Sequence, residues 1–194
     1  MRPLLTRLAA PAAPPVTLEA LKVHLRITEA DEDAALSDLL LRATATLDGP
    51  RGALGRCLMA QSWRVAVPRG VGPRLAIPIV PATGLEAVRR IAPDGTEEAL
   101  DPNAFLLCGD ADFTWILALD GWPAVADRPD ALSFDVTAGA SSAEDVAPDL
   151  RQAILLLAGH WHAHREAVAL GTIATDLPLG VQHIVDLHRL GWIA

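Results

Sequence analysis

The first quarter of the chain carries two stretches in which apolar residues recur at helical spacing. In VTLEALKVHLRI, Leu18, Leu21 and Leu25 share one face, and Thr17 is a suitable N-cap. The next stretch has its own apolar stripe, formed by Leu36, Leu39, Leu40, Ala43 and Leu47. Gly49 and Pro50 end the second pattern. We expect two helices within residues 16–49, joined as an αα-hairpin.

From Gln61 the period changes to two, which is typical of strands with one buried face. Trp63, Val65 and Val67 alternate with smaller or polar residues in SWRVAVP, as Leu132, Phe134 and Val136 do in ALSFDVTAG. The triplet Pro-Asp-Gly at 93–95 predicts a turn between two short strands. Frequent prolines indicate short, partly edge-exposed strands. The pattern predicts a small antiparallel β unit over about 61–139.

Helical spacing returns in APDLRQAILLLAGHWHAHREAVAL, where Pro148 fits the first helical position. Its apolar face consists of Leu150, Ile154, Leu157 and Trp161. A last helix is predicted in LPLGVQHIVDLHRLG from its apolar residues Val181, Ile184, Val185 and Leu187. Gly191 is expected to end this helix. We therefore expect helices within 148–190 and a tail at 191–194.

Together these patterns predict an α+β fold, in which a helical bundle of N- and C-terminal helices carries an inserted small antiparallel β unit. We expect residues 1–15, rich in Ala and Pro, to form a flexible or extended arm. Residues 16–194 are predicted to make a single domain. Arg7 and Pro11 interrupt the only apolar N-terminal run, so we expect no export signal.

Charge narrows the function classes. The 194-residue chain has a formal net charge of -8, and its basic residues are scattered. A nucleic-acid-binding protein normally carries a basic patch or stripe. We therefore expect no tight binding to DNA, although an acidic protein can surround DNA that slides past it.

Three histidines at alternate positions, His160, His162 and His164, raise the question of a metal site. On a strand all three would face one side, whereas on a helix only His160 and His164 share a face. The segment is predicted to be helical, which leaves a two-histidine pair with Glu166 or Asp176 as distant additional ligands. A surface or interface cluster is the preferred interpretation, and a metal site is the alternative.

Other patterns point away from catalysis. GPRGALGR, residues 49–56, lacks the Lys-Ser/Thr ending of a phosphate loop, and no strand leads into it. Ser141 and Ser142 have no nucleophile-elbow pattern around them. Cys57 and Cys108 have no Cys or His at metal-ligand spacing, so we expect two reduced thiols. We predict no catalytic residue, no metal ligand and no cofactor.

The C-terminal end is unusually apolar, since Trp192 and Ile193 stand where termini are ordinarily polar. Two interpretations stay open. The tail folds back onto its own core, or the last helix and tail dock onto another protein, with Trp192 as an anchor.

The order of segments resembles the head–tail connector family of long-tailed phages and, most closely, the adaptor of a gene transfer agent. The segments that carry the resemblance are PVTLEALKVHLRITEADEDAALSDLLLRATATLD, LMAQSWRVAV, SFDVTAG, VAPDLRQAILLLAGHWHAHREAV and LPLGVQHIVDLHRL. His160 with Trp161, and Arg165 with Glu166, match the "HW…REAV" pattern of the family. His162 and His164 fall at positions that the family fills variably, and Gly49–Gly55 departs from its usual second-helix end.

The resemblance implies a structural adaptor with no reaction and no cofactor. Such proteins assemble as a ring, usually twelvefold, between the portal protein and a stopper or tail-completion protein. The ring continues the DNA channel, and DNA passes without specific binding. The implied location is the neck of a phage-like particle assembled in the bacterial cytoplasm, with no membrane partner.

We place the contacts as follows. Portal docking is predicted at Leu187, Leu190, Trp192 and Ile193, and ring contacts at Arg151, Arg165 and Glu166. Two alternatives remain: a histidine-dependent metal-binding protein or small metalloenzyme that uses His160 and His164, and a monomeric soluble interaction module.

Overall fold

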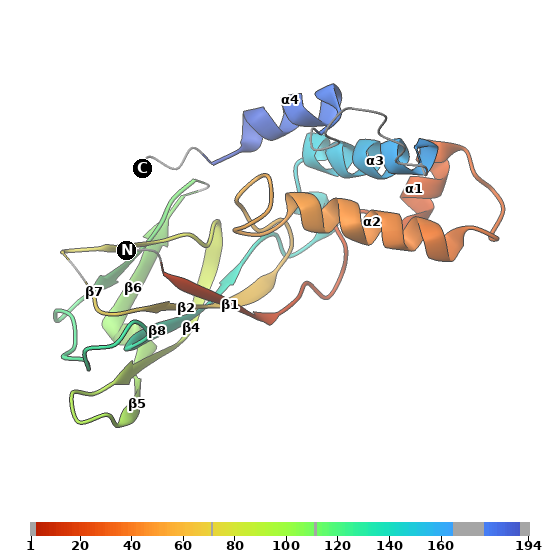
Figure 1. Ribbon diagram of the computed structural model, residues 1–194. Helices are drawn as coiled ribbons and strands as arrows, with labels where there is room; N and C mark the ends of the chain where they lie inside the picture. The colour runs from red at the N-terminus through yellow and green to blue at the C-terminus, as the bar shows by residue number, and fades with distance from the viewer. Residues whose placement is uncertain (1–2, 71, 111, 165–176, 191–194) are drawn as a thin grey trace, which may run out of the picture. The chain divides into compact units, whose positions relative to one another are not determined.

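A computed structural model describes residues 3–70, 72–110, 112–164 and 177–190. Within them the chain divides into two compact units (Figure 1). The β unit comprises residues 1–12 and 59–140, and the helical unit comprises residues 13–58 and 141–194. The chain therefore passes between the units three times, after Ala12, after Leu58 and after Ala140. The two units are described separately below.

The larger sheet of the β unit has five strands in the order β1-β2-β8-β4-β5, and every neighbouring pair is antiparallel. Its strands are β1 (Leu4–Ala9), β2 (Gln61–Val67), β4 (Ala82–Ile91), β5 (Glu97–Leu100) and β8 (Leu132–Ala138). The smaller sheet has the order β3-β7-β6 and is also antiparallel. It consists of β3 (Leu75–Ile77), β6 (Phe105–Gly109) and β7 (Thr114–Ala118).

Alternation in β2 and β8 gives the five-stranded sheet one apolar face. Trp63 lies opposite Val136, and Val65 lies opposite Phe134. Val65, Phe134 and Val136 are completely buried. Phe134 also meets two aromatic rings of the β unit, with centroids 5.8 Å from Phe105 and 6.4 Å from Trp122. These contacts form the core of the β unit.

The helical unit contains α1 (Leu18–Leu25), α2 (Asp33–Leu47), α3 (Pro148–Ala163) and α4 (Leu179–His188). One-turn 3₁₀ helices lie at Pro102–Ala104 in the β unit and at Ala143–Asp145 here. Thr17 caps α1 by accepting a hydrogen bond from the Ala20 amide at 3.2 Å. Gly159 brings α3 close to α1, because a Cβ there would lie 3.3 Å from a methyl carbon of Leu25. Pro148 occupies the first turn of α3. None of the helices among the described residues has the length and apolarity to cross a membrane.

The α+β fold, the N-terminal αα-hairpin and the hairpin turn at 93–95 are confirmed. The β content is larger than a helical bundle with a small insertion implies, because eight strands form two sheets in the described chain. Strands β1 and β6 are not anticipated by the sequence patterns. The last helix ends at His188, before the predicted stop at Gly191.

The N-terminal stretch differs most from its prediction. Where a flexible or extended arm is expected, Leu4–Ala9 is extended and pairs with β2 as an edge strand. Backbone hydrogen bonding to β2 therefore holds this part of the stretch in the sheet. The tail at 191–194 lies outside the described residues, and a single connector domain over 16–194 stays a prediction.

Candidate functional site

Helix α4 has one buried and one exposed stripe, as expected of a helix that packs on its own unit and can also contact another protein. Val181 and Val185 are 0% and 2% exposed. On the other side Leu179 is 89% exposed and Leu187 is 67% exposed. Leucines this accessible bury little apolar surface within their own unit and so add little to its stability. They are therefore candidates for a contact surface. We call Leu179 and Leu187 the α4 outer leucines.

Two polar contacts hold the C-terminal end of α4 within the helical unit. The ring of His188 hydrogen-bonds to the Asp149 carboxylate at the start of α3. This bond lowers the pKa of Asp149 below its ordinary value. Two residues further on, the Leu190 amide donates to the Leu54 carbonyl at 3.2 Å. The end of α4 is thereby tied both to α3 and to the loop that follows α2.

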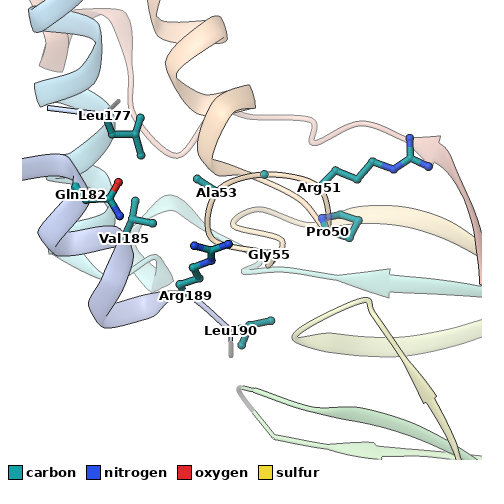
Figure 2. Close-up of a pocket in the computed structure, with 10 residues that line it drawn as sticks. Pro50, Arg51, Ala53, Gly55, Leu177, Gln182, Val185, Arg189 and Leu190 are labelled. Atoms are coloured by element: carbon teal, nitrogen blue, oxygen red, sulfur yellow. The ribbon is translucent and has the colours of Figure 1, made fainter. Parts of the chain in front are cut away.

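An open hollow of about 380 Å³ lies between that loop and α4 (Figure 2). The loop contributes Pro50 to Ala53 and Gly55, and α4 and the residues beside it contribute Leu177, Gln182, Val185, Arg189 and Leu190. The Arg189 side chain extends toward Gly55, whereas Arg51 points away from the hollow (Figure 2). The stretch 49–56 therefore packs as a loop within the helical unit, and its Leu54 is completely buried.

The alternating histidines diverge as the helical interpretation predicts. The rings of His160 and His164 lie with centroids 4.4 Å apart, and His164 Nδ1 is 2.9 Å from the His160 carbonyl oxygen. His162 instead reaches the Glu32 carboxylate, with Nε2 and Oε2 2.9 Å apart. Among the described residues no three His, Cys, Asp or Glu side chains gather where they could hold a metal ion. His162 thus joins α3 to the start of α2.

His160 also lines a second hollow, of about 410 Å³, on the same unit. Its other lining residues are His24, Leu25, Leu156, Gly159, Pro178, Gly180 and Val181. The lining is mostly apolar and draws on α1, α3 and the start of α4. The two histidines on its wall are the only titratable side chains among these lining residues, and nothing in the hollow resembles a catalytic pair.

The predicted docking residues separate into three groups. Leu187 is exposed on α4. Leu190 is only 7% exposed, because its side chain packs beside the loop that receives its amide hydrogen bond. Trp192 and Ile193 lie outside the described residues. An exposed α4 stripe that includes Leu179 is what the sequence patterns missed, although Leu179 begins the same helical period as Leu187.

Of the three predicted ring-contact residues, the structure describes one. Arg151 is half-buried on α3, and its Nε is buried without a hydrogen-bond partner. Arg165 and Glu166 lie outside the described residues. The buried Nε of Arg151 has a free-energy cost, because a buried donor without a hydrogen-bond partner has lost its bonds to water.

A polar cluster on the five-stranded sheet was not singled out from the sequence. Arg64 on β2 donates to both Asp135 carboxylate oxygens, at 2.7 and 2.9 Å, and Arg89 on β4 donates to Oδ2 at 2.6 Å. Burial raises the pKa of Asp135, but the bonds from Arg64 and Arg89 outweigh it, and the pKa lies below its ordinary value. The signal available in the sequence was alternation, which puts Arg64 and Asp135 on the polar face of their strands.

Ser141 and Ser142, for which the sequence shows no nucleophile pattern, take part in loop structure. The hydroxyls of Ser141 and Ser142 both donate to an Asp145 carboxylate oxygen, at 3.1 and 2.9 Å. No histidine takes part in these bonds, so the serine–base arrangement of a hydrolase is not formed here.

The fold of this chain matches solved structures of known proteins. Among solved structures, a chain in the neck of an empty gene transfer agent particle, computed with sixfold symmetry, matches with a TM-score of 0.79 and 26% identity. The match covers 98% of this chain and 97% of that one. The chain resembles a neck protein of gene transfer agent particles. A chain in the virion of the native particle matches equally well. A chain in the native neck, computed with twelvefold symmetry, matches at a TM-score of 0.72 and 25% identity, with the same coverage.

No protein-family model matches the chain, and no curated protein matches it. The resemblance inferred from the order of segments is confirmed by the structural match over nearly the whole chain of the neck-like protein. The match supports a structural neck or connector protein of a phage-like particle.

Proposed function

We propose that this neck-like protein is a structural adaptor that forms a ring, twelvefold in the simplest case, between the capsid portal and a stopper or tail-completion protein. The ring continues the DNA channel and catalyses no reaction. The observation that carries the proposal is the fold match over 98% of the chain to neck chains. Two of the matched necks are described with sixfold and twelvefold symmetry, as a ring requires.

The charge of the chain supports the channel role. At a formal net charge of -8, the protein repels phosphates on average. Binding of DNA by basic residues releases counterions and slows passage, so an acidic wall favours sliding. The proposed ring therefore surrounds DNA without holding it.

The portal-docking surface, on this proposal, is the outer side of α4 together with the tail. The α4 outer leucines are available for contact, and Trp192 and Ile193 extend the apolar character of the chain beyond them. Leu190 has a different role, since its burial beside the loop after α2 fixes the direction in which the chain leaves α4. An apolar anchor on a fixed base is typical of docking hot spots.

The decisive experiment mixes the purified protein with the portal protein of the same particle and examines the mixture by native mass spectrometry and electron microscopy. A ring of the neck-like protein seated on one end of the portal is the expected result. A monomer that does not bind the portal protein at micromolar concentrations would overturn the adaptor role in favour of a monomeric interaction module.

The docking surface has its own test in two matched substitutions of exposed apolar residues. Leu187→Asp is expected to leave folding intact and to weaken portal binding at least tenfold, because it puts a charge into an apolar contact. The control is Val23→Asp, on α1, where Val23 is 78% exposed and equally free of its own fold. Equal portal binding by both variants would remove α4 from the docking surface.

A further inference from the structure

Strand β1 is an open edge of the five-stranded sheet. In the described chain it pairs with β2 alone, and its other side carries unpaired backbone groups. Leu4 and Leu8 are 52% and 45% exposed. Monomeric proteins protect such edges with lysines, prolines or inward charges. The strand LLTRLA has no lysine and no proline, and its protection is limited to a register irregularity between Arg7 and Ala9 and to the charge of Arg7 beside Trp63.

Strand β5 is the opposite edge of the same sheet. It pairs with β4 alone among the described strands, and its sequence is Glu-Glu-Ala-Leu. Glu97 and Ala99 are exposed, and Glu98 forms an ion pair with Arg90 at 2.8 Å. The β1 edge carries the opposite charge through Arg7, an exposed residue whose guanidinium lies 5.0 Å from the centre of the Trp63 ring. The two open edges thus differ in charge.

The strand order also sets the relative directions of the two edges. Four antiparallel pairings separate β1 from β5, so these strands run the same way. A second copy related by rotation can therefore bring its β5 alongside β1 as a parallel pair, without turning over. An interface between two different edges of one subunit is heterologous, and a heterologous interface closes into a ring when the rotation fits.

We propose that β1 of one copy pairs with β5 of the next copy, so that the five-stranded sheets join edge to edge around the ring. The occupant of the β1 edge is thus a second copy of this chain. Backbone hydrogen bonds give the contact its affinity, and the basic and acidic edges favour this pairing over β1 with β1. The inference rests on the proposed ring and names its subunit contact.

Crosslinking of full-length protein tests the pairing directly. In a Cys108→Ser background, Thr6→Cys on β1 is combined with Ala99→Cys on β5, and a short bismaleimide is added to assembled rings. Both residues are exposed, whereas the remaining Cys57 is only 2% exposed. Neighbouring strands lie about 4.8 Å apart, so the two thiols come within reach of the reagent. A ladder of covalent oligomers is expected. The matched control pairs Thr6→Cys with Ala45→Cys, an exposed position in the helical unit.

Variants that block the β1 edge test the proposed pairing independently of crosslinking. Leu4→Lys and Leu8→Lys add the charge that natural edges use for protection and should reduce ring affinity about tenfold or more. The control is Leu106→Lys, at a leucine that is 49% exposed elsewhere in the β unit. The fraction of ring is measured by native mass spectrometry, alone and on the portal, with circular dichroism to confirm folding.

Each outcome decides something. A ladder with the Thr6–Ala99 pair, and rings lost with the Leu4 and Leu8 variants, supports edge pairing. Rings that form normally but give no ladder above control, or that tolerate lysine at both β1 positions, overturn edge pairing and leave the ring role intact. If the wild-type protein forms no ring, either alone or with the portal protein, both the edge pairing and the proposed ring are overturned.

Discussion

At the residue scale, the Asp135 cluster is the strongest polar feature of the β unit. The Asp135 side chain is 10% exposed, and two arginines on neighbouring strands bind it. Removal of one member of such a group leaves the others desolvated and unpaired, which costs more than the net contribution of the intact group.

We expect Asp135→Asn to lower the free energy of unfolding by about 2 kcal/mol, less than for a fully buried ion pair because both guanidinium groups are partly exposed. Urea unfolding followed by tryptophan fluorescence measures the change. Asp130→Asn is the control, because its ion pair with Arg128 is exposed on both sides. No measurable change is expected there, and equal losses from both variants would mean that burial of Asp135 is unimportant.

The same residue predicts a dependence on pH. The pKa of folded Asp135 lies below the ordinary 3.8. Its stabilising contribution is therefore fully present above pH 3.8 and is lost as the pH falls through the lower, folded-state pKa. The difference in unfolding free energy between wild type and Asp135→Asn should shrink in that range. A difference that stays constant from neutral pH down to acid unfolding would contradict the assignment.

At the element scale, α4 depends on a few contacts at its C-terminal end. It is a ten-residue helix with no side-chain N-cap, so tertiary contacts supply most of its stability. Val181 and Val185 provide the buried stripe, and the His188–Asp149 bond fastens the last turn to α3.

We expect His188→Ala to speed amide hydrogen exchange in α4 several-fold, with little effect on α2, because only the last turn loses its tie. Hydrogen–deuterium exchange with mass spectrometry gives the readout. His183→Ala, at an exposed position of the same helix, serves as the control. Unchanged exchange in His188→Ala would show that the buried valines alone hold the helix.

Elements with one buried face were the ones that the sequence predicted well. The four helices and the β4–β5 turn follow from apolar period, caps and turn residues. Strand β6 was missed for a physical reason: it is apolar on both sides. Its residues Phe105 and Leu107 pair with Ala118 and Ile116, and Leu106 and Cys108 pair with Leu117 and Trp115 on the other face, so no alternation remains.

Strand β1 was missed for a different reason, since its outer face mixes Leu4 and Leu8 with Thr6, and Arg7 lies on the face of Trp63. The order of strands in the large sheet depends on pairings between distant parts of the chain, such as β1 with β2, that local periodicity does not encode. The α4 outer stripe could have been found, because Leu179 and Leu187 are two turns apart on one predicted helix.

At the scale of the whole molecule, the net charge predicts how the protein treats DNA. Non-specific DNA-binding proteins reach dissociation constants of about 10⁻⁴ to 10⁻⁶ M at physiological salt through their basic residues. At a formal charge of -8, this protein should give no gel shift with linear duplex DNA at micromolar concentration, even at low salt. Binding that weakens steeply with salt would instead reveal a basic surface and contradict free passage.

The three crossings of the chain between its units bear on mechanics. Two of them leave the β unit side by side, because Met59 bridges Ala140 and the Ala60 amide donates to the Ala140 carbonyl at 2.8 Å. The third follows β1. A force that pulls the helical unit away from the β unit is therefore shared among three segments of the chain. A single proteolytic cut in one of these segments would leave the other two connecting the units. In a protein with one linker, the same cut would separate the units.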